Sequence, residues 1–333
     1  MKILIVTDLS THNSANSLYK LANALFDHPL IETVVVASRG IQKNESFFKC
    51  KSMVHIEGYH INRHISFFDK DELVREISTY KLNSFDNIIL RLPYPIDQDF
   101  FPALTQNFDE TRIINRPSGI ALTGDKAFLL KMKTYTPPIQ LCHNLEEIFD
   151  FSSQYECVLK PRFSYGGKGI LRIQKERVWF GDQERSVNDF VEEYKENPQS
   201  YLAMKFLKNV SKGDKRLIVV NGEIVSSSLR LPNKGSWLCN ISQGGKNFIS
   251  EPTKGECAMI QKINSLLSEH GIFYYGVDTI LDDDGTRKIS EINTSSIGGF
   301  VAPYKEDQPS PESKFANHFV NYYNESNVEN THR

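Results

Sequence analysis

The most informative segment of the chain is residues 276–293, which read GVDTILDDDGTRKISEIN. Two apolar-rich runs flank the polar stretch 282–285, and this pattern predicts a β-hairpin with Asp284-Gly285 as its two-residue turn. A turn centred there places Asp278 directly opposite Glu291 on the neighbouring strand, and a four-residue loop with the same centre gives the same pairing. Glu291 and Asn293 are two residues apart on one strand, so their side chains point to the same face.

This hairpin predicts a cation site, because it sets two carboxylates against each other. Side chains directly opposite on a ladder have Cβ atoms roughly 4.5–5.5 Å apart, and like charges at that distance repel. Asp278, Glu291 and Asn293 offer two carboxylates and an amide oxygen, which are hard donors suited to Mg²⁺. The alternative is an exposed hairpin with one acid on each face and no metal.

The composition of the whole chain is that of an ordinary globular protein. Its 333 residues suffice for about two domains, and 40% of them are hydrophobic. Lysine and arginine number 39 against 41 aspartates and glutamates, so the net charge is −2. A protein dedicated to nucleic acid or to a membrane surface needs a basic field, and this balance argues against both.

The cysteines and the N-terminus indicate the compartment. The five cysteines, at positions 50, 142, 157, 239 and 257, form no Cys-x-x-Cys pair, and their odd number favours free thiols in a reducing compartment. The first apolar stretch ends at Asp8, too short for a signal-peptide core, and no run is long enough to cross a bilayer. We therefore expect a soluble, cytoplasmic protein.

The first third of the chain predicts a parallel α/β domain, because strand and helix patterns alternate. The expected strands are 3–6, 33–37, 87–92 and 111–115, and the expected helices are 18–26, 71–80 and 99–108. The polar stretch 8–14 after the first strand contains no glycine, so the dinucleotide fingerprint of a dehydrogenase is missing.

The pattern changes after residue 123. Helices are expected at 124–132, 145–151, 256–270 and 312–323, and strands at 157–160, 170–173, 201–207, 216–220 and 223–229. Asn221-Gly222 predicts a tight hairpin that places Arg216 opposite Ser227, with Arg230 at the end of the return strand. Guanidinium groups so placed could clamp phosphoryl or acyl-phosphate oxygens, and exposed arginines at a hairpin base are the alternative. The tail after Asn324 is polar and expected to fray.

A second candidate for phosphate binding is Lys160, which ends an apolar strand and is followed by the loop Gly166-Gly167-Lys168-Gly169. Glycines let backbone N–H groups approach phosphate oxygens closely. The loop is not a P-loop, because the spacing fails, no serine or threonine follows the lysine, and a strand follows the loop. A flexible hairpin turn is the alternative interpretation.

These motifs occur in one order along the chain, together with Lys126, Gly213-Asp-Lys-Arg216, Asn240 and Gly244-Gly245. The ordered series resembles the bacterial glutathione synthetase family of the ATP-grasp superfamily. The resemblance implies an α/β and α+β fold: an N-terminal Rossmann-like (pre-ATP-grasp) domain followed by a two-lobed ATP-grasp domain. The implied division is 1–122 for the substrate-side domain, 123–200 for the first lobe with its glycine-rich loop, 201–324 for the second lobe with the metal site, and 325–333 for a flexible tail.

The resemblance also implies residue roles. Arg216 and Arg230 would be catalytic and stabilise an acyl phosphate, while Asp278, Glu291 and Asn293 would hold Mg²⁺, with Mn²⁺ as an alternative. The residues implied for ATP are Lys126, Lys160, Gly166, Gly167, Lys168, Gly169, Lys205, Phe206, Leu207 and Asp214. Those implied for the other substrates are Arg91, Asn240, Gly244, Gly245, Ser295 and Ser296.

The implied activity is an ATP-dependent carboxylate–amine ligase, which would join γ-glutamylcysteine and glycine through an acyl phosphate. Its partners would be small molecules, with no nucleic acid and no membrane, and a homo-oligomer stays open. Two departures bear on the substrates. Residues 294–299 read TSSIGG where the family has Thr-Ser-Pro-Thr, and Pro93 stands where an acid is usual. A ligase of the same chemistry with another peptide or amine, and a non-catalytic ATP-binding protein, are the alternatives.

Overall fold

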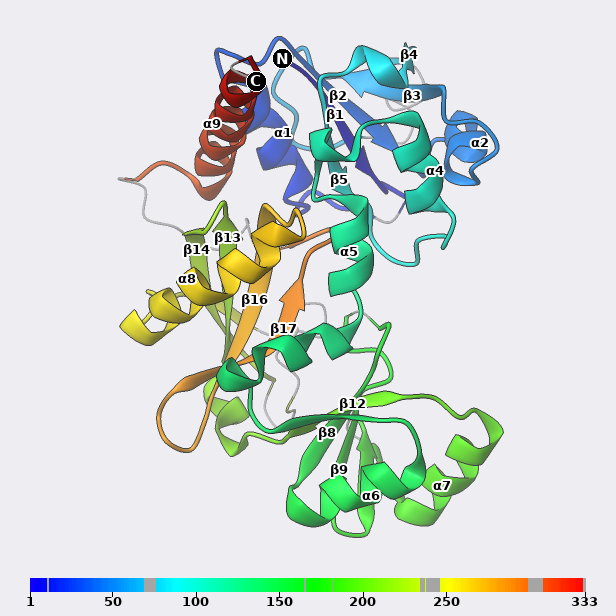
Figure 1. Cartoon of the computed structure of the whole chain (residues 1–333), viewed down its shortest axis with the longest axis vertical. Coiled ribbons are helices and arrows are strands. Elements are labelled where there is room, and N and C mark those ends of the chain that lie inside the picture. The colour runs from blue at the N-terminus through cyan, green and yellow to red at the C-terminus, as the bar shows by residue number, and fades with distance from the viewer. Residues whose placement is uncertain are drawn as a thin grey trace.

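The computed structural model describes residues 1–10, 12–68, 76–164, 166–181, 183–233, 237, 246–298 and 308–331. In this part of the chain the strands form three sheets. The first and second sheets lie at opposite ends of the long axis, and the third sheet lies between them (Figure 1). None of the helices described is long and apolar enough to span a membrane.

The first sheet has the order β4-β3-β2-β1-β5-β6. Strands β1 (Lys2–Thr7), β2 (Thr33–Ser38), β5 (Asn87–Arg91) and β6 (Ile113–Ile114) are parallel, while β3 (His55–His60) and β4 (Ile77–Lys81) are antiparallel additions at one edge. The helices of this region are α1 (Leu18–Phe26), α2 (Glu45–Phe48), α4 (Phe100–Asn107) and α5 (Pro117–Thr123), with short 3₁₀ helices at Gln42–Asn44, Leu82–Ser84 and Glu110–Arg112. Continuous apolar runs such as residues 3–6 of β1 suit a parallel sheet covered on both faces.

One predicted element of this region is wrong. The expected helix 71–80 is a strand from Ile77 onward, where β4 pairs with β3; residues 71–75 lie outside the described residues. The segment Ile77-Ser-Thr-Tyr80 is rich in β-branched and aromatic residues, which favour a strand once a partner strand is available.

The second sheet has the order β11-β10-β9-β8-β12-β7. Its strands are β7 (Ile139–Cys142), β8 (Cys157–Pro161), β9 (Leu171–Gln174), β10 (Arg177–Phe180), β11 (Gln183–Ser186) and β12 (Tyr201–Lys205). Helices α6 (Leu145–Gln154) and α7 (Val187–Glu196) pack on one face through an apolar cluster, which leaves the other face for the site. Because β12 pairs with β7 and β8, the boundary expected at residue 201 falls one strand too early.

The third sheet has the order β15-β14-β13-β16-β17. Its strands are β13 (Asp214–Val220), β14 (Glu223–Leu231), β15 (Lys246–Ile249), β16 (Tyr274–Leu281) and β17 (Arg287–Asn293). Helix α8 (Lys254–Glu269) covers one face, where Met259 and Ile263 join a buried cluster with Leu217 and Val277. The opposite face carries the charged residues described below.

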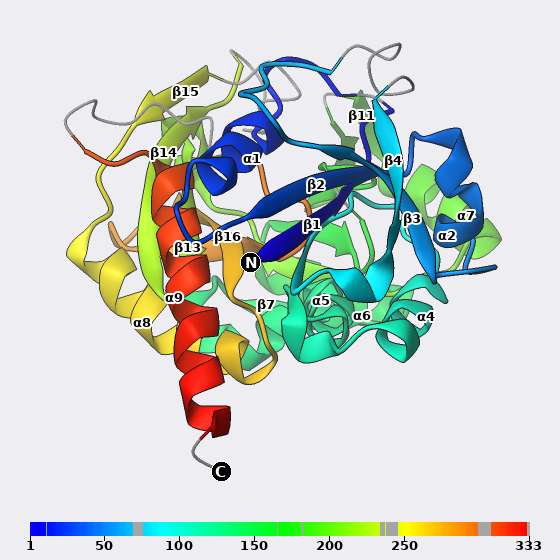
Figure 2. The ribbon, with the colours of Figure 1, turned by 90° about the horizontal axis from the view of Figure 1, so that it is seen from above.

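The remaining helices connect the three sheets. The stretch expected as an α-helix at 124–132 is a 3₁₀ helix, Lys126–Tyr135, and a second one spans Lys208–Lys212. Helix α9 (Pro311–Thr331) packs beside α1 of the first domain (Figure 2). It continues to Thr331, so the expected flexible tail 325–333 is helical over most of its length.

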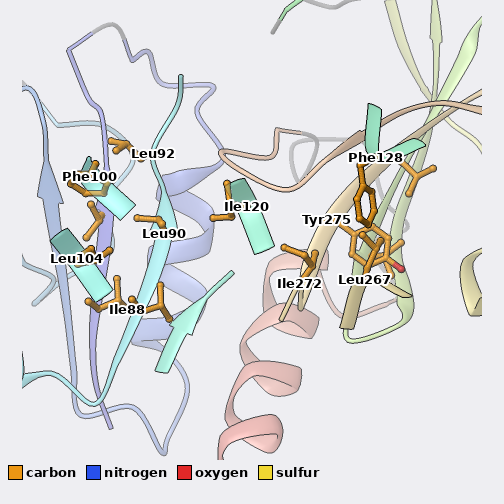
Figure 3. Close-up of a cluster of buried hydrophobic side chains, with 14 of the residues drawn as sticks. Ile88, Leu90, Leu92, Phe100, Leu104, Ile120, Phe128, Leu267, Ile272 and Tyr275 are labelled. Carbon is orange, nitrogen blue, oxygen red and sulfur yellow. The ribbon is translucent and has the colours of Figure 1, made fainter. Parts of the chain in front are cut away.

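A continuous core ties the first sheet to the third. Figure 3 shows β5 residues packed on α4 (Ile88, Leu90, Leu92, Phe100 and Leu104) and, beyond Ile120 of α5, a group around Tyr275. A buried polar contact reinforces this junction. Asn115, at the end of β6, donates from Nδ2 to the carbonyls of Tyr274 (2.5 Å) and Thr294 (2.8 Å) and accepts from the N–H groups of Phe273 and Tyr274.

Glu256 connects α8 to the third sheet and is almost fully buried. It closes the capping box of α8 with Thr253, accepts from the Thr279 hydroxyl at 2.8 Å, and lies 3.1 Å from Lys215 Nζ. Burial alone would raise the pKa of Glu256, but the hydrogen bonds from Thr253 and Thr279 and the Lys215 ammonium outweigh burial and lower it. The ionised form is therefore stabilised in the folded state.

We predict that Glu256→Gln lowers the free energy of unfolding at pH 7 by about 3 kcal/mol, because a buried ammonium loses its partner. The contribution of a carboxylate with a lowered pKa is present above its unfolded pKa and is lost as the pH falls below that value. The stability difference between the two proteins should therefore shrink toward pH 3. Urea unfolding at both pH values checks this, with Glu269→Gln at the exposed end of α8 as control. Equal stability of Glu256→Gln and the parent at pH 7 would contradict it.

Candidate active site

The hairpin of β16 and β17 places Asp278 opposite Glu291, as predicted. The turn itself differs from the prediction. A register shift after Asp278 leaves Ser290 as an extra residue on β17, so Leu281 faces Arg287 and residues 282–286 form the loop. Such a bulge bends the strand locally and changes which side chains reach a given face.

The hairpin of β13 and β14 also contains a bulge. Asn221-Gly222 forms the predicted two-residue turn, with Val220 facing Glu223. A shift between Ile218 and Val219 then moves the register by one residue, so Arg216 faces Ser228 rather than Ser227. The prediction was wrong here because the turn residues cannot report a bulge that occurs beyond them.

The shifted register joins four charged side chains on one face of the third sheet. Arg216 donates from Nε to Asp278 Oδ1 and from Nη2 to Asp278 Oδ2 at 2.6 Å. Arg230 forms a paired contact with Asp214, at 2.8 and 2.6 Å, and its Nη2 lies 2.9 Å from Asp278 Oδ2. Paired contacts of this kind fix both the position and the orientation of a guanidinium group.

The two acids respond differently to this environment. Burial opposes ionisation of Asp278, but the guanidinium groups of Arg216 and Arg230 outweigh it and lower the pKa of Asp278 to about 2. Burial dominates at Asp214, where it raises the pKa despite the contact with Arg230, because Asp278 adds repulsion. Asp278 is therefore the firmly ionised member of the pair.

Two buried lysines approach the same region from the second-sheet side. Lys160, at the end of β8, donates to the carbonyl of Ser290 at 2.7 Å. Lys126 donates to the carbonyl of Ser164, and its Nζ lies 3.8 Å from Glu291 Oε1. Burial lowers the pKa of both lysines, although Glu291 opposes the shift. Four basic groups thus surround three carboxylates, and an anion can satisfy the excess positive charge.

A cavity opens between the second and third sheets beside these charges, and we refer to it as the central cavity. It encloses about 740 Å³ of space free of protein atoms, part of it open to solvent. Strand β8 contributes Lys160 and Val158, two residues apart, and β16 contributes Asp278 and Ile280 in the same way. The cavity therefore has a charged end and an apolar end. Its other lining residues are Pro137, Gly167, Ile170, Met204, Lys205, Phe206, Leu207, Val210, Asp214, Trp237, Ser290 and Glu291.

The segment 205–207 expected to contact ATP lines the apolar end. The N–H of Lys205 donates to the carbonyl of Pro138, and that of Phe206 to the carbonyl of Glu156 at 2.7 Å. These two amides are already bonded within the protein. The Lys205 ammonium lies 3.7 Å from Asp282, so this side chain also links the second sheet to the turn of the third.

The glycine loop lies near the cavity with a backbone that requires glycine. Gly166, Gly167 and Gly169 have φ values of +65°, +76° and +72°, in the left-handed region that disfavours side chains. Gly167 lines the cavity, while Lys168 is exposed and does not. The structure thus brings part of the predicted loop to the site.

None of the described residues expected for the other substrates lines the central cavity, and three more lie outside the described residues. Arg91, at the end of β5, is buried and donates to Ser17 Oγ at 3.0 Å and the Ile297 carbonyl at 3.2 Å, while its Nε and Nη1 are buried with no hydrogen bond. Ser295 donates to the Leu92 carbonyl at 2.7 Å, and Ser296 has a φ of +45°. Asn240, Gly244 and Gly245 lie outside the described residues.

A second cavity, of about 470 Å³, also has Glu291 in its lining. Asn293 and Ser295 line it from the third sheet, and Lys126 and Tyr94 line it from the opposite wall. Glu291 lines both cavities.

The oxygen atoms of Asp278, Glu291 and Asn293 fit a hard divalent cation, although Asp278 also pairs with two arginines. Glu291 is partly exposed, and the buried amide of Asn293 has an unpartnered Nδ2, so no hydrogen bond fixes which of its atoms faces the site. Asp278 already accepts from two guanidinium groups. Among the described residues, no group of three or more His, Cys, Asp or Glu side chains is placed to hold a metal ion by itself. An oxygen set of two carboxylates and one amide is the kind that Mg²⁺ takes when substrate phosphates complete its shell.

Several residues of the site had no sequence signal of their own. Ser290 contributes a backbone carbonyl to Lys160, and Trp237 enters the cavity from a glycine-containing connection. Ile280 could have been found, because it follows Asp278 at the two-residue period of a strand. The four described cysteines (50, 142, 157 and 257) are free thiols, and none of them lines the central cavity.

Comparisons with known proteins agree with this geometry. The family model described as "Prokaryotic glutathione synthetase, ATP-grasp domain" matches residues 125–305. A glutathione synthetase of Bradyrhizobium diazoefficiens is 28% identical over 226 residues, covering 66% of this chain and 68% of its own. One of Buchnera aphidicola subsp. Schizaphis graminum is 25% identical over 262 residues, covering 77% and 76%.

Solved structures show the same fold. The crystal structure of the D-cycloserine synthetase DcsG superposes with a TM-score of 0.64 at 13% sequence identity, over 97% of this chain and 99% of the other. At that identity the similarity speaks for the fold alone. The family match covers more than half of the chain and contains both hairpins, both lysines and the glycine loop. The chain therefore belongs to the prokaryotic glutathione synthetase family of ATP-grasp enzymes.

Proposed function

We propose that this ATP-grasp ligase is a glutathione synthase, which joins γ-glutamylcysteine to glycine with hydrolysis of ATP to ADP and phosphate. The observation that carries the proposal is that Lys160, Asp278 and Glu291 line the central cavity together. Lys126 lies beside Glu291, and Arg216 and Arg230 pair with Asp278. Relatives named glutathione synthetase support the choice of substrates.

In this proposal ATP occupies the central cavity along its length. The base lies at the apolar end, against the segment 204–207, and the triphosphate lies at the charged end, where Lys126 and Lys160 neutralise it. The glycine loop 166–169 covers the phosphates, because its backbone leaves N–H groups free of side-chain crowding. Asp214, which lines the cavity and is held by Arg230, would approach the ribose.

Glu291, Asn293 and Asp278 would hold Mg²⁺, which when bound neutralises the phosphate charge and orients the γ-phosphoryl group. A peptide carboxylate oxygen attacks the γ-phosphorus and ADP leaves, which gives an acyl phosphate. The amine then attacks the acyl carbon, and phosphate leaves with that carboxylate oxygen. Arg216 and Arg230 stabilise the negative charge during both steps.

The remaining substrates would approach from the first domain, which we take to be a Rossmann-like, substrate-side domain. Arg91 has two unbonded N–H groups at the edge where its parallel strand ends, and it can hold a carboxylate of the peptide. Ser295, Ser296, Asn240, Gly244 and Gly245 are proposed for the acceptor side. We further propose that the protein acts in the cytoplasm.

The test is a matrix of peptides and amines, with ADP release and product mass measured for each combination. We predict ADP release only when Mg²⁺, γ-glutamylcysteine and glycine are all present, together with a product of the mass of glutathione. If another amine gives product while glycine gives none, the chemistry stands and the glutathione assignment falls. Tight ATP binding without turnover for any combination would favour a non-catalytic role instead.

A further inference from the structure

The indole of Trp237 lines the central cavity, although this residue belongs to the connection between β14 and β15 of the third sheet. We propose that Trp237 is a nucleotide-binding residue, which forms a wall at the base end of the cavity and is held there by a turn of the second sheet. The inference rests on the proposed function, because it takes the occupant of the cavity to be ATP.

The first supporting contact crosses from the third sheet to the second. Trp237 Nε1–H donates to the carbonyl of Gly181 at 3.2 Å, and Gly181 forms the turn between β10 and β11. Gly181 has a φ of +58°, and nothing lies within 4 Å of the position that a Cβ would take. The hydrogen bond therefore joins a side chain of the cavity lining to a turn of the second sheet.

The second contact sets the geometry of the apolar end. The Trp237 ring meets the Phe206 ring edge-on, with centroids 6.2 Å apart. Phe206 is itself fixed, because the Arg172 guanidinium lies 4.1 Å from its ring and is paired with Glu156. The backbone N–H of Phe206 also donates to the carbonyl of Glu156 at 2.7 Å. Trp237 is therefore placed against a rigid aromatic partner.

These contacts leave an aromatic corner beside the apolar side chains of Val158 and Met204. A flat purine base gains from aromatic contact whatever its detailed hydrogen bonding, since every base has a π-face. Trp237 is also half-buried rather than part of a sealed core, which fits a side chain that completes its contacts with a ligand.

The experiment measures ADP dissociation by stopped-flow displacement in the full-length protein, together with inhibition by inorganic tripolyphosphate, which has no base. For Trp237→Ala we expect the ADP dissociation rate to rise roughly tenfold, while the inhibition constant of tripolyphosphate stays within about twofold. Trp237→Phe keeps an aromatic ring but loses the hydrogen bond to Gly181. Its ADP dissociation rate should lie between those of the parent and of Trp237→Ala. Phe248→Ala, an exposed aromatic on β15 outside the cavity, is the matched control.

The chain has two tryptophans, so Trp179→Phe leaves Trp237 as the sole indole reporter. Its emission should change when MgADP is added, and the same addition should leave the emission of Trp237→Phe unchanged. If the parent protein binds ADP in equilibrium dialysis and Trp237→Ala releases ADP at the same rate as the parent, the inference about Trp237 is wrong and the proposed function still stands. Equal weakening of ADP and tripolyphosphate also overturns it, because the effect would then not concern the base. Absence of ATP and ADP binding by the parent overturns the proposed function as well.

Discussion

Replacing Lys160 by methionine is expected to reduce kcat/KM for ATP by about 1,000-fold, which is the order of effect seen when a group that stabilises transition-state charge is removed. Lys160 is fully enclosed at the charged end of the central cavity, with its ammonium on the Ser290 carbonyl and near Glu291 and Asp278. Methionine keeps an unbranched apolar chain close to the length of lysine, and it removes the charge and the hydrogen bond to the Ser290 carbonyl. The fold should persist, because Lys126 still faces Glu291, and Arg216 and Arg230 still pair with Asp278, after Lys160 is replaced.

A coupled assay of ADP formation at saturating peptide and glycine measures the effect, and thermal unfolding checks the fold. Lys208→Met is the matched control, since Lys208 is exposed on the 3₁₀ helix next to the cavity. If Lys160→Met kept its activity within about fivefold of the parent, Lys160 could not be a group that stabilises charge on the transferred phosphate, because removing such a group costs far more activity.

The second large effect is expected at Glu291, which both cavities share. Glu291→Gln should lower kcat/KM by at least about 100-fold and raise the Mg²⁺ concentration needed for half-maximal activity, because a neutral amide is a poorer ligand for a hard cation. Stability should change little, since the side chain is partly exposed and its nearest cation, Lys126, lies 3.8 Å away.

Asp284→Asn tests whether any acid in this hairpin would give the same result. Asp284 lies in the exposed turn 282–286, where it accepts from Thr286, and asparagine can keep that contact. Its activity and Mg²⁺ dependence should match those of the parent. Near-normal turnover of Glu291→Gln, measured over a Mg²⁺ titration, would remove Glu291 from the metal site.

The pairing of Asp278 with Glu291 could be predicted because it depends on local information. Turn residues and two flanking apolar runs set the strand directions, and the strand period sets the faces. The bulge at Ser290 was not predictable in this way, and the pairing survived only because the longer turn compensates for the extra residue. In the other hairpin no such compensation occurs, and the partner of Arg216 shifted by one residue.

The charge network around Asp278 could not be predicted from the sequence. It depends on Arg216 and Arg230 approaching one carboxylate from neighbouring strands, which requires the bulge of β14 and the order β14-β13-β16. Sheet order is a tertiary property, and no local pattern in either hairpin encodes it. The same holds for Trp237, whose place is set by the turn at Gly181 of another sheet.

In the first domain, too, the features set by local sequence could be predicted and those set by strand pairing could not. Its parallel strands were predictable from apolar runs, whereas β4 was taken for a helix because its strand identity comes from pairing with β3. The tail beyond Asn324 was expected to fray because its composition is polar, but it continues the helix α9.

The central claim is that the site activates a peptide carboxylate as an acyl phosphate, and oxygen transfer tests it most directly. γ-Glutamylcysteine carrying ¹⁸O in both oxygens of its cysteinyl carboxylate is turned over with glycine and MgATP, and the released phosphate is analysed by mass spectrometry. The account predicts one ¹⁸O atom in each phosphate molecule and one in the new amide. Phosphate without ¹⁸O, released alongside product, would contradict it.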